Sequence, residues 1–341
     1  MNMNMNQKMI VTILGILIAL VLIILIAIIV LENTNSKKVM NFSNVAQVEN
    51  KNEVNEDPEE NTVENKIENK VENTTEDPDK ITGEIEEIET EDGGKIPVPP
   101  TFEYIEGSSA EGAVIADEDG NEFVWIPVGN INNYQRQLFL HNGEGGNSES
   151  TLEEENIRDI NAYNEEFDDS IRNYGGFYIA RFEAGKGEED KLVSKKDELV
   201  WTGVTWEKAR DLSLNMYKEN DFFQTDLVNS YAWDTICTWL RNCGINIDDS
   251  TEIGNYQNNV DNQKKIVATG SNEKWKTNNI YDMAGNAWEY TTEECGEHEK
   301  YHMGRGGGFW NEGHVYPISS RGQSEDNANL AIGFRVVMYL K

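Results

Sequence analysis

The segment Asn278–Thr291 reads NNIYDMAGNAWEYT, and three shorter segments follow it. In chain order these are GRGGGFWN at 304–311, SSRGQ at 319–323 and IGFRVV at 332–337. Glycine and asparagine are frequent in this C-terminal part, and both residues are typical of turns and irregular loops. We therefore expect a final buried strand at Ile332–Tyr339, preceded mainly by loops and short strands.

Two apolar runs upstream predict further strands. Phe123–Val128 reads FVWIPV and Phe177–Phe182 reads FYIARF, and both combine β-branched and aromatic residues over the length of a strand. Residues 141–170, between the two runs, are polar and are expected to form a loop. The proline-rich stretch 96–100 is expected to be a stiff entry to the domain.

Two amphipathic helices are predicted between these strands and the C-terminal loops. Thr205 is placed to cap the first helix, and the second begins near Asn229 and ends at Gly244. Each helix has an apolar face, formed by Trp206, Ala209, Leu212 and Met216 in the first and by Trp233, Ile236, Cys237 and Leu240 in the second. Two helices among short strands, without a β-α-β rhythm, predict an α+β domain.

The N-terminus carries a predicted membrane segment. Residues 9–31 contain no charged side chain, and a helix of that length spans roughly 35 Å, enough for the hydrocarbon core of a bilayer. The alternative is a cleaved signal peptide, but residues 32–35 offer no small-residue cleavage site. We expect an uncleaved signal-anchor in the cell membrane, with residues 1–8 cytoplasmic and the C-terminal domain extracellular.

Residues 32–95 are expected to be a disordered, acidic tether rich in Asn and Glu. Residues 41–95 contain 18 acidic side chains, five lysines and a single aromatic residue, too little apolar surface to offset the entropy of ordering. A helix is the alternative, because Val63, Ile67 and Val71 recur every four residues. The β-branched and Asn-rich composition disfavours it, so we expect the repelling charges to extend the chain.

The composition excludes two classes of protein. The 341 residues carry 62 acidic and 29 basic side chains, a formal net charge of −33, with no dense basic patch for nucleic acid. Three cysteines rule out a disulfide framework. Two of these, Cys237 and Cys243, fall on the second predicted helix and are expected to be unpaired thiols.

Taken in order, the four C-terminal segments resemble the motifs of the formylglycine-generating enzyme, or sulfatase-modifying factor, family. Three upstream segments resemble its opening strands and first helix: FVWIPVG at 123–129, GFYIARFEAG at 176–185 and VTWEKARDL at 204–212. The resemblance covers residues 121–341. It implies that residues 96–341 form a C-type-lectin-like fold with two helices, short strands and extensive irregular loops.

Formylglycine-generating oxidases convert a cysteine of a sulfatase to formylglycine with a pair of copper-binding cysteines. The positions of this sequence that match that pair are Asn311 and Tyr316, and no cysteine follows Cys295. Neither an amide nor a phenol can supply the thiolate ligand that Cu(I) prefers. We therefore expect the oxidase mechanism of the family to be absent.

The resemblance also implies a structural Ca²⁺ site. In the family, the segment matching residues 282–289 wraps a calcium ion. Carried over, the ligands are the side chains of Asp282 and Glu289 and the backbone carbonyls of Gly285 and Ala287. Oxygen donors on one tight turn suit this cation. The alternative is a glycine turn in which the two carboxylates make ordinary hydrogen bonds.

Residues 309–331 are the predicted recognition surface, because the family places its active cleft in the same stretch. Aromatic and small polar side chains are mixed there, as in many binding surfaces. The candidate ligand-binding residues are Trp310, Asn311, Glu312, His314, Tyr316 and Gln323.

Two functions follow from these features. The first is a non-catalytic, membrane-anchored domain that binds or displays an extracellular protein or carbohydrate ligand. The second is an enzyme that modifies exported proteins, by formylglycine-type oxidation or a related activity. The missing cysteine pair favours the first function.

Overall fold

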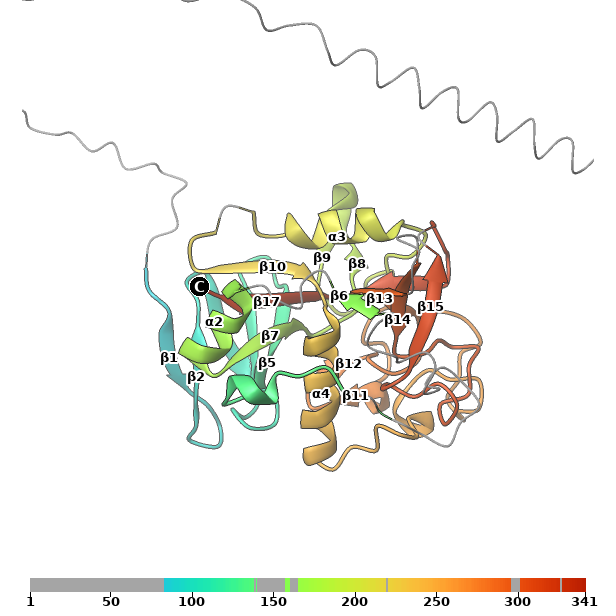
Figure 1. Cartoon of the computed structure of the whole chain (residues 1–341), viewed down its shortest axis with the longest axis horizontal. Coiled ribbons are helices and arrows are strands. Elements are labelled where there is room, and N and C mark those ends of the chain that lie inside the picture. The colour runs from blue at the N-terminus through green and yellow to red at the C-terminus, as the bar shows by residue number, and fades with distance from the viewer. Residues whose placement is uncertain are drawn as a thin grey trace, which may run out of the picture. The chain divides into compact units, whose positions relative to one another are not determined.

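The main element of the fold is a six-stranded antiparallel sheet (Figure 1). The structure is a computed structural model that describes residues 83–137, 139, 157–159, 165–218, 220–295, 301–325 and 327–341. In spatial order the strands of the sheet are β10 (Phe223–Leu227), β17 (Val336–Leu340), β7 (Gly176–Ala180), β5 (Glu122–Pro127), β4 (Val114–Asp117) and β3 (Phe102–Glu106). Strands β5 and β7 confirm the two upstream strands predicted from the apolar runs.

Both faces of this sheet are buried at its central strands β5, β7 and β17, which explains why these three are apolar without alternation. On β17, Val337 and Tyr339 join one core cluster, whereas Val336 and Met338 join a second cluster on the other face. The first cluster includes apolar residues of the helices α2 (Glu165–Tyr174) and α4 (Ser230–Asn242), and the second includes residues of α3 (Trp206–Leu214). Helices therefore cover the sheet on both sides.

The two predicted helices are confirmed at their capped starts. The Thr205 hydroxyl accepts a hydrogen bond from the Lys208 backbone N–H at 3.2 Å at the start of α3. The Asn229 side chain accepts one from the Ala232 N–H at 2.7 Å at the start of α4. Helix α4 ends at Asn242, two residues before Gly244, which has the positive φ expected of a residue just after a helix.

Helix α2 was not predicted, since its first six residues lie within 141–170, where we expected a loop. Its sequence EEFDDSIRNY is mostly polar, and Phe167 and Ile171 are its two apolar residues that are almost fully buried. Phe167 stacks on Tyr339 of β17 with ring centroids 3.8 Å apart. A helix with so narrow an apolar stripe is stabilised by tertiary packing rather than by propensity, so the sequence pattern alone indicated a loop.

A second, five-stranded sheet contains the glycine-rich motif segments. Its main path is β15 (Arg321–Glu325), β14 (Tyr301–Arg305), β13 (Trp288–Cys295) and β16 (Ile332–Phe334), and β6 (Ile157–Asp159) pairs with β13. Strands β13 and β16 are parallel, and the other pairs are antiparallel. Three two-stranded sheets complete the described strands: β1 (Glu86–Glu89) with β2 (Lys95–Val98), β8 (Gly185–Lys186) with β9 (Leu192–Val193), and β11 (Lys276–Thr277) with β12 (Ile280–Tyr281). The short 3₁₀ helices are η1 (Ile131–Asn133), η4 (Glu188–Asp190), η5 (Thr251–Ile253) and η6 (Glu273–Trp275).

The predicted single strand Ile332–Tyr339 is in fact two strands in two different sheets. Strand β16 pairs with β13, and β17 joins the six-stranded sheet. Arg335, between them, is fully buried, and its guanidinium donates to the carbonyls of Ala180 and Tyr281. The chain changes sheets at this arginine, so the C-terminal segment links the two sheets directly.

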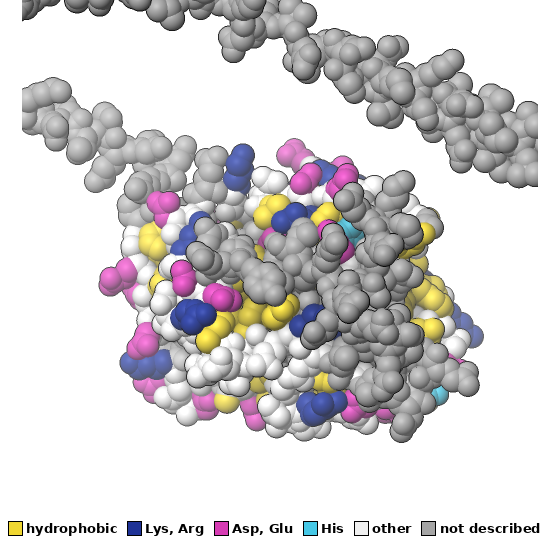
Figure 2. Space-filling model, in the orientation of Figure 1, with side chains coloured by type: hydrophobic (Ala, Val, Ile, Leu, Met, Phe, Trp, Pro, Cys, Tyr) yellow, Lys and Arg dark blue, Asp and Glu magenta, His cyan; other side chains and the backbone are white. Residues whose placement is uncertain are grey.

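The structure corrects one end of the predicted tether and does not describe the predicted membrane segment. Strand β1 lies inside the range 32–95 predicted to be a disordered tether, but Glu86–Glu89 pairs with β2 in a hairpin. The predicted membrane segment 9–31 and most of the tether lie outside the described residues. Within the part of the chain that the structure describes, no helix is long and apolar enough to cross a membrane. Acidic and basic side chains are interspersed on the face of the molecule in Figure 2.

Candidate functional site

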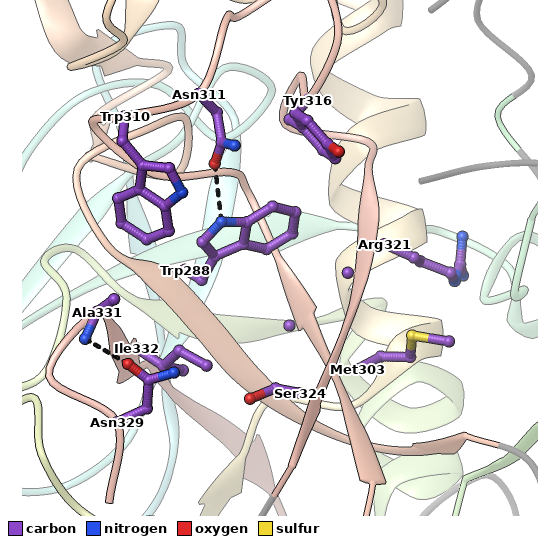
Figure 3. Close-up of a pocket in the computed structure, with 12 residues that line it drawn as sticks. Trp288, Met303, Trp310, Asn311, Tyr316, Arg321, Ser324, Asn329, Ala331 and Ile332 are labelled. Carbon is purple, nitrogen blue, oxygen red and sulfur yellow. Dashed lines mark hydrogen bonds between the residues drawn. The ribbon is translucent and has the colours of Figure 1, made fainter. Parts of the chain in front are cut away.

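A cavity of about 410 Å³ opens between the second sheet and the predicted recognition segment (Figure 3). This volume is within the range of small-molecule sites. We call it the aromatic cavity. Its lining comes from β13, β14, β15, the 309–317 loop and the chain entering β16: Trp288, Met303, Gly304, Trp310, Asn311, Tyr316, Arg321, Gly322, Ser324, Asn329, Ala331 and Ile332. Five separate segments therefore meet at one site.

Trp288 lies against two glycines that face each other across β14 and β15. Gly304 and Gly322 are direct partners in the register of these strands. A Cβ atom on Gly322 would lie 2.7 Å from the Trp288 Cη2 atom, and one on Gly304 would lie 3.3 Å from its Cε3 atom. The glycines therefore let the indole pack directly on the strands, where it forms one wall of the cavity.

The 309–317 loop fixes the edge of that indole. Trp288 Nε1 donates to Asn311 Oδ1 at 2.9 Å, and the Gly308 backbone N–H donates to the same oxygen at 2.9 Å. The Tyr316 ring meets the indole edge to face, with ring centroids 5.7 Å apart. Asn311 and Tyr316 thus hold the wall and line the cavity at the same time.

Trp310 is the exposed aromatic residue of the cavity. Its side chain is 39% exposed, although its ring packs closely on Gly308, where an added Cβ would lie 2.5 Å away. The Phe309 ring supports it edge to face at 5.0 Å. Figure 3 shows the indoles of Trp310 and Trp288 next to each other in the cavity. Trp310 therefore presents a supported aromatic surface to a ligand.

Arg321 is the one charged residue among the described residues that line the cavity, and carboxylates already surround it. Its Nε donates to both oxygens of Glu293 at 2.9 and 3.1 Å, its Nη2 pairs with Asp234, and its Nη1 donates to the Gln137 carbonyl at 3.1 Å. These carboxylates raise the pKa of Arg321 against the effect of burial. A ligand in the cavity consequently finds no uncompensated charge on these lining residues.

The same carboxylates hold a second buried arginine. Arg305 of β14 donates to Asp234 at 2.7 Å and to the Ser320 carbonyl at 2.8 Å. Arg136, which is partly exposed, lies 3.3 Å from Glu293. We call these five residues the arginine cluster: Arg136, Asp234, Glu293, Arg305 and Arg321. It ties α4 to β13, β14 and β15 behind the cavity.

The structure places the six predicted ligand-binding residues in three different settings. Trp310, Asn311 and Tyr316 line the aromatic cavity. Glu312 and His314 instead approach each other at 3.4 Å and contact the 257–258 turn, outside the lining residues. The backbone of Gln323 pairs with Met303 in the sheet, and its side chain lies outside the described part of the chain.

Sequence reasoning missed most of the other lining residues. Trp288 was not selected, and although it is only 8% exposed it lines the cavity. Asn329 and Ala331 fall inside the predicted segment 309–331 but were not selected. Gly304 and Gly322 were the sequence signal for this wall of the cavity, because glycines in strands often mark a place where a ring packs closely. The pairing register, however, is visible only in the fold.

The predicted calcium ligands belong to a different buried group. Asp282 Oδ2 accepts a hydrogen bond from the Gly270 N–H at 2.7 Å, whereas Oδ1 is buried without a hydrogen-bond partner among the described residues. Glu289 accepts bonds from Arg335 Nε at 2.9 and 3.1 Å and from Nη2 at 2.6 Å. Gly285 and Ala287 lie in the turn between these two carboxylates.

Glu183, which the sequence analysis did not select, completes this group. Its carboxylate accepts hydrogen bonds from Asn286 Nδ2 at 2.5 Å and from the Ala287 N–H at 3.1 Å. Burial, with the charges of Asp282 and Glu289, raises the pKa of Glu183 well above its usual value. Burial likewise raises the pKa of Asp282 to about 7. We call Glu183, Asp282, Glu289 and Arg335 the carboxylate cluster.

The carboxylate cluster partly fits a hard cation. Three carboxylates against one guanidinium leave excess negative charge, and Asp282 Oδ1 is an available oxygen donor. Arg335 already occupies much of the hydrogen-bonding capacity of Glu289. No group of three or more His, Cys, Asp or Glu side chains in the described ranges is arranged to hold a metal ion. A cation here would therefore also need the backbone carbonyls of Gly285 and Ala287.

The expectation of unpaired thiols is confirmed for Cys237 and Cys243, which are both free. Cys237 is fully buried on α4, and burial raises its pKa to about 12. A thiol with so high a pKa is mostly protonated and a poor nucleophile. Cys237 therefore provides no reactive group for the cavity.

Comparison with known proteins gives one family match. The model of the Sulfatase-modifying factor enzyme 1-like domain matches residues 113–340. No curated protein matches the chain. Among solved structures, CarF is 14% identical, and the match covers 49% of this chain and 87% of CarF with a TM-score of 0.37. PvdO from Pseudomonas aeruginosa is 13% identical, with 67% and 98% coverage and a TM-score of 0.43. Treponema denticola variable protein 1 is also 13% identical, with 70% and 99% coverage and a TM-score of 0.27.

Proposed function

Because the chain belongs to the sulfatase-modifying factor enzyme 1-like family, we propose that it is a membrane-anchored extracellular binding protein that holds its ligand in the aromatic cavity. One observation carries this proposal. Asn311 and Tyr316, which match the copper-binding cysteines of the family oxidases, both line the cavity. If the resemblance holds at these positions, an amide and a phenol that contact Trp288 would take the place of the oxidase chemistry.

The lining supports binding rather than group transfer. It combines three aromatic side chains with small neutral polar groups, a composition that favours recognition of an extracellular protein or carbohydrate. The described lining residues include the hydroxyls of Tyr316 and Ser324, but no Cys, His, Lys, Asp or Glu that would serve as a thiolate nucleophile or as a general base for these hydroxyls.

The experiment compares the two functions directly. The full chain is incubated with copper and a Cys-x-Pro-x-Arg peptide, and aldehyde is measured with a hydrazide probe. In parallel, the wild-type chain and Trp310→Ala are applied to an array of oligosaccharides and peptides. We expect no aldehyde and at least one probe whose binding depends on Trp310. Aldehyde formation would show an oxidase and would overturn the proposal.

The anchor is the second part of the proposal. Residues 9–31 would span the membrane, and the acidic tether would hold the domain away from a negatively charged cell surface. Fractionation of cells that express the full chain should place it in the membrane fraction. Protease added outside should remove the domain from intact spheroplasts. A soluble chain, or a domain protected from the protease, would contradict this topology.

We also propose that a structural Ca²⁺ ion binds at the carboxylate cluster. Asp282 and Glu289 would hold it with the carbonyls of Gly285 and Ala287, and Glu183 would fix the turn by accepting from the Asn286 side chain and the Ala287 N–H. Such an ion would neutralise the excess negative charge and stiffen the turn that leads into β13. Its role would be structural, because none of these residues lines the aromatic cavity.

A further inference from the structure

We propose that the ligand of the aromatic cavity is a neutral saccharide, and that one sugar ring stacks on Trp310. This inference rests on the binding function proposed above and narrows it from protein or carbohydrate to one class of ligand. Three features of the cavity support it: the charge of its lining, the number of aromatic faces it presents and the hydrogen-bonding groups that remain available.

The first feature is the charge state of the lining. Arg321, the charged residue among the described lining residues, is 1% exposed and bonded to Glu293, Asp234 and a carbonyl. A phosphate, sulfate or carboxylate of a ligand would lose its hydration here without gaining a free cation. An ammonium or guanidinium group would likewise gain no free carboxylate from these residues. The lining therefore favours a ligand without formal charge.

The second feature is the number of aromatic faces. Trp288 packs on Gly304 and Gly322 and meets the ring of Tyr316 edge to face, so these two rings are largely occupied by each other and by the sheet. Trp310 is the ring that is 39% exposed. A cage for a quaternary ammonium ion needs aromatic faces on several sides, whereas a sugar ring needs one flat surface for its polarised C–H groups.

The third feature is the set of remaining polar groups. Both hydrogen bonds at the Asn311 side chain end on Oδ1, which leaves its amide N–H groups to donate to a ligand. At the lower rim in Figure 3, Asn329 likewise uses Oδ1 to accept from the Ala331 N–H. Two amide donors beside an aromatic face match the hydroxyl oxygens around a sugar ring. A cavity of about 410 Å³ also has the size of a small-molecule site.

The experiment uses the full chain in a detergent without a sugar head group, since a glycoside detergent would compete. The chain is applied to an array of neutral oligosaccharides of glucose, galactose, mannose and N-acetylglucosamine, alongside sialylated and sulfated counterparts and proline-rich peptides. We expect binding to neutral saccharides. Trp310→Ala should weaken it about 30-fold, the loss typical of an aromatic anchor.

Two further variants separate stacking from folding. Trp310→Phe keeps an aromatic face and should retain most of the affinity. Val260→Ala changes a residue that is 90% exposed and outside the cavity lining, so it should bind as the wild type does. The thermal unfolding of all three variants is compared with that of the wild type. Binding is interpreted only for a variant that unfolds as the wild type does.

Each contrary result overturns the inference. A preference for sialylated or sulfated saccharides would show that charge is recognised. If no saccharide on the array bound, saccharides would be excluded as the ligand of the aromatic cavity. Trp310-dependent binding of peptides without saccharides would overturn this inference and leave the proposed binding function standing. Formation of aldehyde in the copper assay would instead overturn the proposed function.

Discussion

Two buried ionic clusters lie in the same domain, and they differ in charge balance. In the arginine cluster, Asp234 and Glu293 face two fully buried guanidinium groups, with Arg136 at the edge. In the carboxylate cluster, Glu183, Asp282 and Glu289 face Arg335 alone. In the first, the two carboxylates balance the two buried arginines, the partly exposed Arg136 adds a further positive charge at the edge, and the cluster supports the aromatic cavity. The second leaves excess negative charge, which only a proton or a cation can neutralise.

Because their charge balance differs, the arginine cluster and the carboxylate cluster should have different effects on binding and stability. The arginine cluster keeps the walls of the cavity fixed, and its one member among the described lining residues, Arg321, is already paired with both carboxylates. The carboxylate cluster lies under the turn 282–287 and carries the titratable groups whose pKa values are raised by burial. Stability should therefore respond to pH and Ca²⁺ through the second cluster, while binding should depend on the cavity that the first supports.

The largest effect is expected from Asp234→Ala. This change removes one of the two carboxylates that Arg305 and Arg321 share and leaves Glu293 to face both buried guanidinium groups, which should cost about 3–5 kcal/mol of unfolding free energy. Chemical denaturation of the full chain measures it. Asp248→Ala is the matched control, because it removes an exposed ion pair with Arg241 and should cost less than about 1 kcal/mol. Equal losses in the two variants would contradict the proposed role of the arginine cluster.

The second prediction concerns pH. The pKa of Asp282 is raised from 3.8 to about 7, so between these values the folded state binds more protons than the unfolded state. Stability must then fall as pH rises from about 4 to about 7. At about 1.4 kcal/mol per unit, the shift sets an upper limit of about 4 kcal/mol.

The variant Asp282→Asn tests this slope, since asparagine keeps the shape and can accept from the Gly270 N–H. Its Tm, measured with a chelator present, should fall less than that of the wild type between pH 4 and pH 7. The difference between the two curves isolates this carboxylate from the many exposed ones. Parallel curves would mean that Asp282 does not titrate as the structure predicts.

The third prediction concerns the effect of Ca²⁺ on stability, which should act through the carboxylate cluster and not through the arginine cluster. Ca²⁺ at about 100 times its dissociation constant should stabilise the wild type by about 2.7 kcal/mol at pH 7.5, or several degrees in Tm. Mg²⁺ should do less, because it loses its water ligands reluctantly. The gain should shrink in Asp282→Asn. If Ca²⁺ did not change the Tm of the wild type, the proposed calcium site would be wrong.

The smallest stability effect is expected at the cavity, where packing rather than charge holds Trp288. Gly322→Ala would place a Cβ 2.7 Å from the indole and should cost about 1–3 kcal/mol while weakening ligand binding. In Gly304→Ala the new Cβ would lie at 3.3 Å, so the loss should be smaller. If both variants were as stable as the wild type, Trp288 would not be packed on these glycines.

The parts of the fold that follow from local signals could be predicted from the sequence. Thr205 and Asn229 are good helix caps, and the apolar stripe of α4 has the expected period, so α3 and α4 were found. Helix α2 and strand β1 lie in acidic stretches and depend on their packing partners. The break at Arg335 was missed because an arginine in an apolar run gives no sign of the carboxylate and carbonyls that receive it.

The residues of the candidate site likewise divide into those that local sequence indicated and those that only the fold brings together. Trp310, Asn311 and Tyr316 could be found because they lie close together in one segment between two motifs. Trp288 could not, because its place in the cavity depends on the pairing of Gly304 with Gly322 across two strands. Glu183 is distant in sequence from Asp282 and joins it only in the folded core. Long-range pairing, rather than local propensity, completes both sites.

Stacking of a sugar ring on Trp310 can be measured by saturation-transfer NMR between the full chain and the saccharide that binds most tightly on the array. If a sugar ring stacks on Trp310, magnetisation should transfer from the protein to the C–H groups on one face of a single sugar ring. Trp310→Ala should abolish that pattern, and Trp310→Phe should keep it. Transfer that is spread evenly over the sugar, or that persists in Trp310→Ala, would contradict stacking on Trp310 in the aromatic cavity.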